Sequence, residues 1–383
     1  MCKTYYVNPK IGDDENDGLH EDRAFATLFA INRLNLQPGD SVLLMRDCIF
    51  EKQFLQIRSS GTECCPITIG AYGEGNDPLI AADGQGIWYQ DYGRELDSPT
   101  HVYHGYVSSA VLLYDAEYII VRDLEITNCA EHIIGEKYSQ GDKMERTGVA
   151  VVAKDKGMRR GITLKNLKIH DVNGNVYDKH MNNGGIYMTA LQPENEAVTG
   201  VACFGEILVE GCYVVNVSRW GIAVGYSYAH EQFQGAALKE DVFQKYGHLN
   251  IVIRDNYVKA AGGDGITVMY ALRPLVKHNT ADSVACEMND RIYSEPGNRL
   301  GKVAAAIWPW KCKDALFRYN EVTDTRLNQD GMAYDADSGD GTLCLNGTVA
   351  AQQLSFLGGN VVIRILAQIL KFPADKNFFA LFA

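Results

Sequence analysis

Short segments of alternating apolar and polar residues recur along the chain from about residue 118. One set of these segments has copies at residues 118–123, 161–166, 206–211, 250–255, 273–278 and 314–319. A second set follows glycine-bearing turns, at residues 148–151, 185–188, 221–224, 265–268 and 331–334. Alternation with a period of two predicts half-buried β-strands, so we expect an all-β protein.

The spacing of the first set indicates a solenoid. Its closest copies begin at residues 250 and 273, which lie 23 residues apart. Such a separation fits one coil of a β-helix, and the longer intervals elsewhere predict loop insertions on one face. A β-propeller is the competing repeat fold. It is disfavoured because glycine turns separate single strands here, whereas a blade needs four strands joined by tight hairpins.

The two ends of the chain depart from the repeat. Apolar residues at helical spacing predict an amphipathic helix over about residues 24–35. We expect an N-terminal cap with the first coils over residues 1–117 and further coils with insertions and the active site over residues 118–343. Residues 344–383 carry no copy of either segment. They are either a C-terminal cap or unrelated sequence produced by a shifted reading frame.

The opening of the chain resembles right-handed parallel β-helix proteins of carbohydrate metabolism. The matching residues are 5–7, 16–18, 26–28, 38–40, 60–62, 66–69 and 71–73. The resemblance implies that the N-terminal helix covers the open edge of the first coil, an edge that any stacked sheet must protect.

An acidic stretch at residues 328–341 is the strongest candidate for chemistry. Read as a strand, it places Asp335 and Asp337 on one face, about 6.5 Å apart at the backbone. Two carboxylates that flank one bond are the usual equipment of a glycosidase. Asp330 precedes this strand at a turn, as Asp264 does in an earlier coil, and for Asp264 we expect a structural role. The alternatives for the whole stretch are a solvated turn or a calcium loop.

Aromatic residues are expected beside these acids. Alignment of residues 304–310 with residues 331–337 pairs Trp308 with Asp335 and Trp310 with Asp337. Aromatic faces next to acids suit a sugar ring, whose C–H faces stack on them. The alternative is that both tryptophans cover the solenoid beneath a loop. Lys311 and Tyr187 complete the predicted substrate-binding set.

The β-helix, the Trp308–Trp310 segment and the acidic strand together resemble the β-helical lacto-N-biosidase family of glycoside hydrolases. That resemblance implies two catalytic aspartates seven residues apart, here Asp330 as general acid/base and Asp337 as nucleophile of a retaining mechanism. Asp335 competes for either role, because it shares a strand face with Asp337.

The composition of the chain limits the classes of partner that it can bind. The formal net charge of -12 argues against nucleic acid, which requires a basic surface. The start of the chain lacks a signal-peptide pattern and no apolar run approaches about 18 residues. We therefore expect a cytoplasmic protein without a membrane partner, or an extracellular one if a signal segment has been removed. The ten cysteines show no metal-ligand spacing. We expect an oligosaccharide or polysaccharide partner and no cofactor, with calcium as the alternative; oligomeric state is not predicted.

Two other functions remain open. One is a calcium-dependent polysaccharide lyase, in which Lys311 or Lys245 would remove a sugar proton. The other is a carbohydrate-binding solenoid without catalytic activity. An unsaturated, ultraviolet-absorbing product would indicate the lyase, and binding without turnover would indicate the binding protein.

Overall fold

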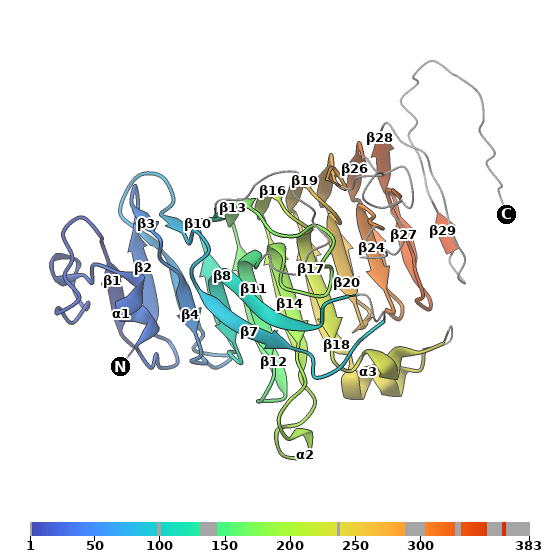
Figure 1. Ribbon diagram of the computed structural model, residues 1–383, viewed down its shortest axis with the longest axis horizontal. Helices are drawn as coiled ribbons and strands as arrows, with labels where there is room; N and C mark the ends of the chain where they lie inside the picture. The colour runs from blue at the N-terminus through green and yellow to red at the C-terminus, as the bar shows by residue number, and fades with distance from the viewer. Residues whose placement is uncertain are drawn as a thin grey trace.

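Parallel strands stack side by side along the long axis of the molecule (Figure 1). The computed structural model describes residues 2–97, 101–130, 144–235, 238–287, 303–325 and 331–350, and the backbone of residues 362–364. Successive strands of the chain pass through three sheets in turn, and each coil packs on the one before it. The expectation of an all-β, parallel β-helix is therefore confirmed.

The first sheet contains β1 (Thr4–Val7), β2 (Ser41–Met45), β5 (Ile67–Tyr72), β9 (Ile119–Arg122), β12 (Met158–Lys165), β15 (Cys203–Glu210), β18 (His248–Arg254), β21 (Ala271–Leu272), β22 (Leu275–Lys277), β25 (Leu316–Arg318), β27 (Leu343–Leu345) and β29 (Val362–Arg364). The second contains β3 (Ile49–Glu51), β6 (Leu79–Ala81), β10 (Glu125–Asn128), β13 (Lys168–Val172), β16 (Tyr213–Val217), β19 (Tyr257–Ala261), β23 (Thr280–Asp282), β26 (Glu321–Thr323) and β28 (Thr348–Ala350). The third contains β4 (Leu55–Ile57), β7 (Ile87–Asp91), β8 (His104–Tyr114), β11 (Glu145–Ala153), β14 (Gly184–Ala190), β17 (Trp220–Ser227), β20 (Ile266–Met269) and β24 (Ile307–Trp310).

The first predicted set of strands forms the first sheet. Ile253 of β18 pairs with Val276 of β22, so the separation of 23 residues is one full coil. Both side chains are fully buried in the solenoid interior. A shift of one residue would turn these apolar side chains outward, and burial of one strand face therefore fixes the register of each coil.

The second sheet was not separated from the first by sequence pattern. From β10 onward, each of its strands begins three residues after the preceding strand of the first sheet ends, across a turn that contains a left-handed residue such as Asp123, Asn166 or Asp255. Aspartate and asparagine adopt this conformation more readily than other non-glycine residues. Because one such residue bends the chain without a glycine or proline, the two strands look like one segment in the sequence.

The N-terminal helix is shorter than predicted. α1 spans Leu28–Asn32, and the 3-10 helix η1 covers Glu21–Arg23, where one helix over residues 24–35 was expected. The side chain of Asn32 donates to the Phe54 carbonyl and accepts from the Gln56 amide of β4, the outermost strand of the third sheet. Asn32 thus binds polar groups at this sheet edge; the wider capping role of the helix remains a prediction.

Insertions lie against the outer face of the third sheet. β7 pairs antiparallel with β8, and the ribbon that contains β7 crosses in front of β11 and β14 in Figure 1. Tyr92, just after β7, donates to the His180 carbonyl and accepts from Thr189 of β14. The remaining helices, α2 (Glu196–Thr199), α3 (Glu240–Tyr246) and the 3-10 helix η2 (His230–Phe233), also lie in connections between strands. In the described part of the chain, no helix is long and apolar enough to cross a membrane.

β27 and β28 extend the first and second sheets past residue 343. β27 pairs with β25 through Cys344 and Phe317, and β28 pairs with β26 through Val349 and Val322. β27 carries Leu345 where β22 and β25 have Lys277 and Arg318, so its sequence does not repeat the earlier segments. The predicted division of the chain at residues 117 and 343 remains a prediction, and most of the tail after Ala350 lies outside the described residues.

Candidate active site

The outer face of the third sheet carries the candidate active site. Across neighbouring strands Tyr187 pairs with Ala223, Ala223 with Thr267, and Thr267 with Trp308. Side chains alternate along a strand, so this row points outward while the adjacent Ile307 is fully buried in the interior. Parallel strands therefore bring residues from four coils into one outward row, which runs on toward the acidic segment.

The acidic segment pairs with β24 in the predicted register. Bridges join Ile307 to Tyr334 and Trp310 to Asp337, as the alignment required. The prediction of a regular strand over residues 332–337 was wrong, because this segment makes only isolated bridges. The Ile307 amide donates to the Ala333 carbonyl and the Lys311 amide to that of Asp337. The residue between these two donors, Pro309, has no backbone N–H, so the hydrogen bond that a regular parallel strand pair would have there is missing.

The three candidate aspartates are placed unequally. Asp337 is half-buried, and its Oδ1 accepts a hydrogen bond of 2.6 Å from Ser338. Asp335 is also half-buried. Asp330 lies outside the described residues, and the catalytic roles remain predictions.

The two tryptophans lie on the outer side of the sheet but in different surroundings. Trp308 is half-buried, and its Nε1 donates to Asp264 at 2.9 Å. Trp310 is 9% exposed and packs against Tyr226 and His230, with ring centroids 5.4 and 5.3 Å away. Trp308 is therefore the more accessible aromatic surface for a ligand.

Lys311 is directed toward the same region. Its Nζ donates to the Phe233 carbonyl at 2.8 Å, and burial lowers the pKa of this amine while the charges of Asp337 and Asp97 oppose that shift. Lys245, the other candidate base, lies in α3, where its amine sits 4.6 Å from the Tyr246 ring centroid. Of the two, Lys311 is the one whose pKa is affected by the charge of a candidate catalytic residue, Asp337.

Tyr187 is fully buried rather than at the surface. Its hydroxyl lies 3.3 Å from the carbonyls of Lys179 and His180 and accepts from the Tyr226 amide. It holds the loop before β14 in place, and direct contact with substrate would require that loop to move. Its substrate-binding role remains a prediction.

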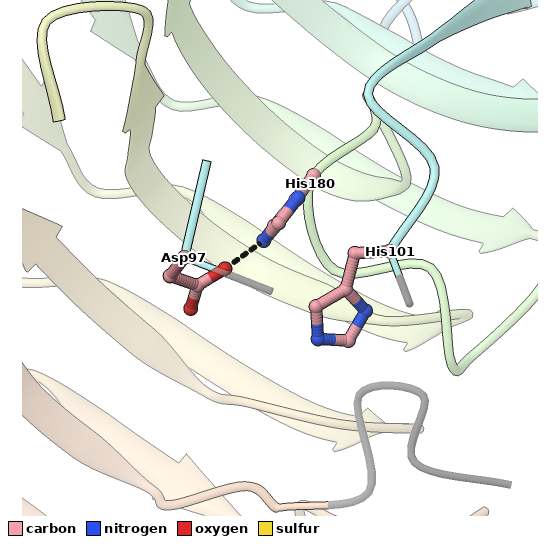
Figure 2. A group of neighbouring side chains, drawn as sticks. All are labelled: Asp97, His101 and His180. Atoms are coloured by element: carbon pink, nitrogen blue, oxygen red, sulfur yellow. Dashed lines mark hydrogen bonds and ion pairs between the residues drawn. The ribbon is translucent and has the colours of Figure 1, made fainter. Parts of the chain in front are cut away.

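Sequence reasoning missed a polar cluster above this row, shown in part in Figure 2. Asp97 Oδ1 lies 2.6 Å from His180 Nε2, while Oδ2 lies 3.3 Å from the Lys179 amine and 3.4 Å from the Tyr226 hydroxyl. Burial alone would raise the pKa of Asp97, but the His180 hydrogen bond and the Lys179 charge outweigh it and hold that pKa well below its usual range. No spacing signal could reveal this cluster, because Asp97 and His180 come from different insertions.

Among the described residues, Asp97, His101 and His180 are the one group that could hold a metal ion, with ligand atoms within 4.8 Å of one another. Burial lowers the pKa of His101 to about 2 and also lowers that of His180, so both rings are neutral near pH 7. Two imidazoles and one carboxylate suit zinc better than calcium, which prefers oxygen ligands. Both oxygens of Asp97 already have partners, Oδ1 in His180 and Oδ2 in Lys179, so we assign the group to side-chain positioning. The expectation of no cofactor, with calcium as alternative, remains untested.

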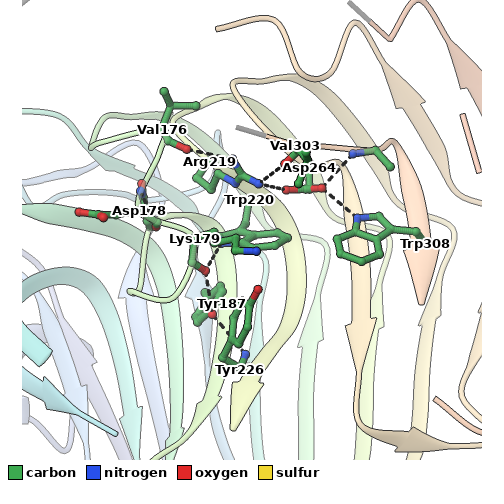
Figure 3. A network of polar contacts seen from close by, with 12 residues as sticks. Val176, Asp178, Lys179, Tyr187, Arg219, Trp220, Tyr226, Asp264, Val303 and Trp308 are labelled. Carbon is green, nitrogen blue, oxygen red and sulfur yellow. Dashed lines mark hydrogen bonds and ion pairs between the residues drawn. The ribbon is translucent and has the colours of Figure 1, made fainter. Parts of the chain in front are cut away.

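A buried ion pair lies beside the N–H edge of the Trp308 indole (Figure 3). Arg219 and Asp264 are 2.6 Å apart, and both side chains are 1% exposed. Burial raises the pKa of Asp264, and the Arg219 charge opposes this shift. The structural role expected for Asp264 thus agrees with its contacts, although those contacts reach the candidate site itself.

Comparison with known proteins identifies close relatives. A scan against models of protein families gave no match. A curated lacto-N-biosidase from Bifidobacterium longum subsp. longum is 41% identical over 379 residues, which cover 89% of this chain and 24% of that protein. The crystal structure of a GH136 lacto-N-biosidase from Eubacterium ramulus, in native and selenomethionine forms, is 61% identical with a TM-score of 0.87 over 91% of this chain and 56% of that one. This chain is similar to lacto-N-biosidases.

The similarity confirms the resemblance inferred from the β-helix and the acidic strand. It extends over most of this chain but only part of each relative. The chain spans about a quarter of the length of the curated relative and a little over half of the solved one.

Proposed function

We propose that this chain is the β-helix part of a glycoside hydrolase that cleaves an oligosaccharide, with lacto-N-biosidase-like specificity. The observation that carries the proposal is the 61% identity and TM-score of 0.87 to the E. ramulus lacto-N-biosidase. The position of Asp337 beside Trp310 on the outer face supports it, because a sugar ring needs an acid and an aromatic surface together.

We assign Asp330 as general acid/base and Asp337 as nucleophile, with Asp335 as the rival for either role. In a retaining reaction the acid protonates the leaving oxygen while the nucleophile attacks the anomeric carbon and forms a glycosyl–enzyme bond. Water then breaks that bond, and the first residue acts as base. Trp308, Trp310 and Lys311 line the substrate side of this arrangement, and Tyr187 supports it from beneath.

Hydrolysis of an aryl lacto-N-bioside tests the proposal. The wild-type chain should release the aryl alcohol, while Asp330→Asn and Asp337→Asn should each lose at least about a hundredfold in kcat, because each removes a group that acts on the bond being broken. Asp335→Asn should lose far less. The matched control is Asp255→Asn, at a left-handed turn position that asparagine also tolerates.

The products distinguish the alternatives. If the reaction is retaining, proton NMR should show that the first product has the same anomeric configuration as the substrate. An unsaturated product absorbing in the ultraviolet, lost on addition of a calcium chelator, would instead identify a lyase. Saturable binding of oligosaccharide without any turnover would reduce the chain to a binding protein and refute the proposed hydrolysis.

A further inference from the structure

The Arg219–Asp264 pair invites a functional explanation because of its position. Both side chains are 1% exposed, and the two groups are 2.6 Å apart. Removal of two charges from water is costly, so a buried ion pair is weak evidence for a contribution to stability. The role of the pair is therefore indicated by the groups that it holds in place.

Asp264 holds the segment that carries Trp308. Its Oδ2 is bound by Arg219, and its Oδ1 accepts hydrogen bonds from the Trp308 indole and the Ala305 amide, each at 2.9 Å. One carboxylate thus fixes both the backbone before β24 and the side chain that projects from it. Figure 3 shows the indole directed toward this carboxylate.

Arg219 extends the network in the opposite direction. Its guanidinium donates to the Val176 carbonyl at 3.1 Å and to the Val303 carbonyl at 2.7 Å, and it lies 5.1 Å from the centroid of the Trp220 ring. Val176 belongs to the connection before β14 that also carries Lys179 and His180. The ion pair therefore joins the two stretches of chain that border the outward row of the third sheet.

We propose that Asp264 is a positioning residue for substrate binding, which holds the Trp308 indole as a fixed surface on which a pyranose ring of the oligosaccharide stacks. The inference rests on the proposed function and adds a specific subsite to it. A free indole would have to be immobilised when the sugar binds, and the Asp264 carboxylate removes that entropic cost in advance. Asp264 touches neither the reacting bond nor the sugar in this arrangement.

Kinetics of three variants test the inference. Asp264→Asn and Trp308→Phe should each raise KM about three- to tenfold, with kcat nearly unchanged. A factor of this size corresponds to the loss of one hydrogen bond or to weaker stacking on the ring. The double variant should resemble Trp308→Phe alone, because Asp264 acts through this indole. Asp40→Asn is the matched control: it is equally buried but binds Lys3 and Gln37 amides near the N-terminus, so KM should not change.

Tryptophan fluorescence gives a readout that needs no turnover. The chain has four tryptophans, of which Trp88, Trp220 and Trp310 are at most 9% exposed, so acrylamide quenching reports chiefly on Trp308. Asp264→Asn should increase the quenching constant, and oligosaccharide should protect the wild-type chain more than the variant. The Asp40→Asn control should quench like the wild type.

The outcomes separate this inference from the proposed function. Unchanged quenching in Asp264→Asn, or KM effects that multiply in the double variant, would overturn the positioning role even in an active enzyme. A chain with no turnover would refute the proposed function, and quenching would still test the contact. If Asp264→Asn does not fold because the Arg219 charge loses the Asp264 carboxylate, the double substitution Arg219→Met with Asp264→Leu removes both charges together. This double substitution should show the same increase in quenching.

Discussion

A row of asparagines inside the solenoid shows how single side chains satisfy buried backbone groups. Asn279 Oδ1 accepts from the Asn256 amide and side chain, and Asn279 Nδ2 donates to the Ile253 carbonyl and to Asn320. All three asparagines are at most 2% exposed. Each follows a left-handed residue at the same turn of its coil. The repeated strands were predicted from the sequence. The hydrogen bonds of these asparagines were not, because each joins residues of different coils.

Asn279→Ala should therefore destabilise the protein by about 1–3 kcal/mol, because it leaves the buried Asn256 amide without an acceptor. Urea unfolding followed by circular dichroism would measure the change. Asn35→Ala, at an exposed position, serves as control and should stay within about 0.5 kcal/mol of the wild type. Equal stability of the two variants would show that the row makes no net contribution.

At the scale of elements, the structure supplies a reason for the glycines at the start of third-sheet strands that the sequence alone did not. They were interpreted as turn residues. A Cβ added at Gly221 would collide with the Gly265 carbonyl and with Val258, and one at Gly185 would meet Gly221 and Val214 in the same way. Glycine recurs there because each coil passes directly over the next, so that no side chain fits between them.

Gly221→Ala should cost about 1–3 kcal/mol or more, since backbone on one side of the new methyl group cannot move away easily. Thermal unfolding would detect the loss. Gly70→Ala in β5 is a suitable comparison, because its new Cβ would meet Arg122 at an ordinary 3.5 Å. If both variants unfold at the same temperature as the wild type, the coils are not packed too closely at Gly221 to accept a methyl group.

At the scale of the whole molecule, insertions and coils are joined by buried acids. Glu145 of β11 accepts from the Asn175 amide, and one oxygen of Glu145 and one of Asp178 have no other hydrogen-bond partner. Burial raises the pKa of Glu145 well above its usual value, and the neighbouring Asp178 adds to this effect. Burial also raises the pKa of Asp178. We infer that the two carboxyls share a proton.

This arrangement predicts the pH dependence of stability. The folded state holds a proton that the unfolded Glu145 releases near its usual pKa of about 4.5, so stability should fall as pH rises through the window above that value. Glu145→Gln should flatten this dependence, because the amide can donate to Asp178 without titrating. Urea unfolding at several pH values between about 4.5 and 8 would check the slope. The exposed Glu63→Gln should keep the wild-type slope; a Glu145→Gln slope equal to it would contradict the shared proton.

The sequence by itself determined the coils, their register and the pairing of Trp310 with Asp337, because period-two alternation and the burial of one strand face leave few other arrangements. The tertiary structure decided what surrounds that pair. Asp97, Lys179 and His180 reach the site from insertions, and Arg219 and Asp264 meet across two coils beside Trp308. These contacts join residues that are 45 to 83 positions apart in the sequence, and the distance between them in space depends on how loops fold over the sheet. Periodicity describes only neighbours along a strand and between coils, so it could not predict them.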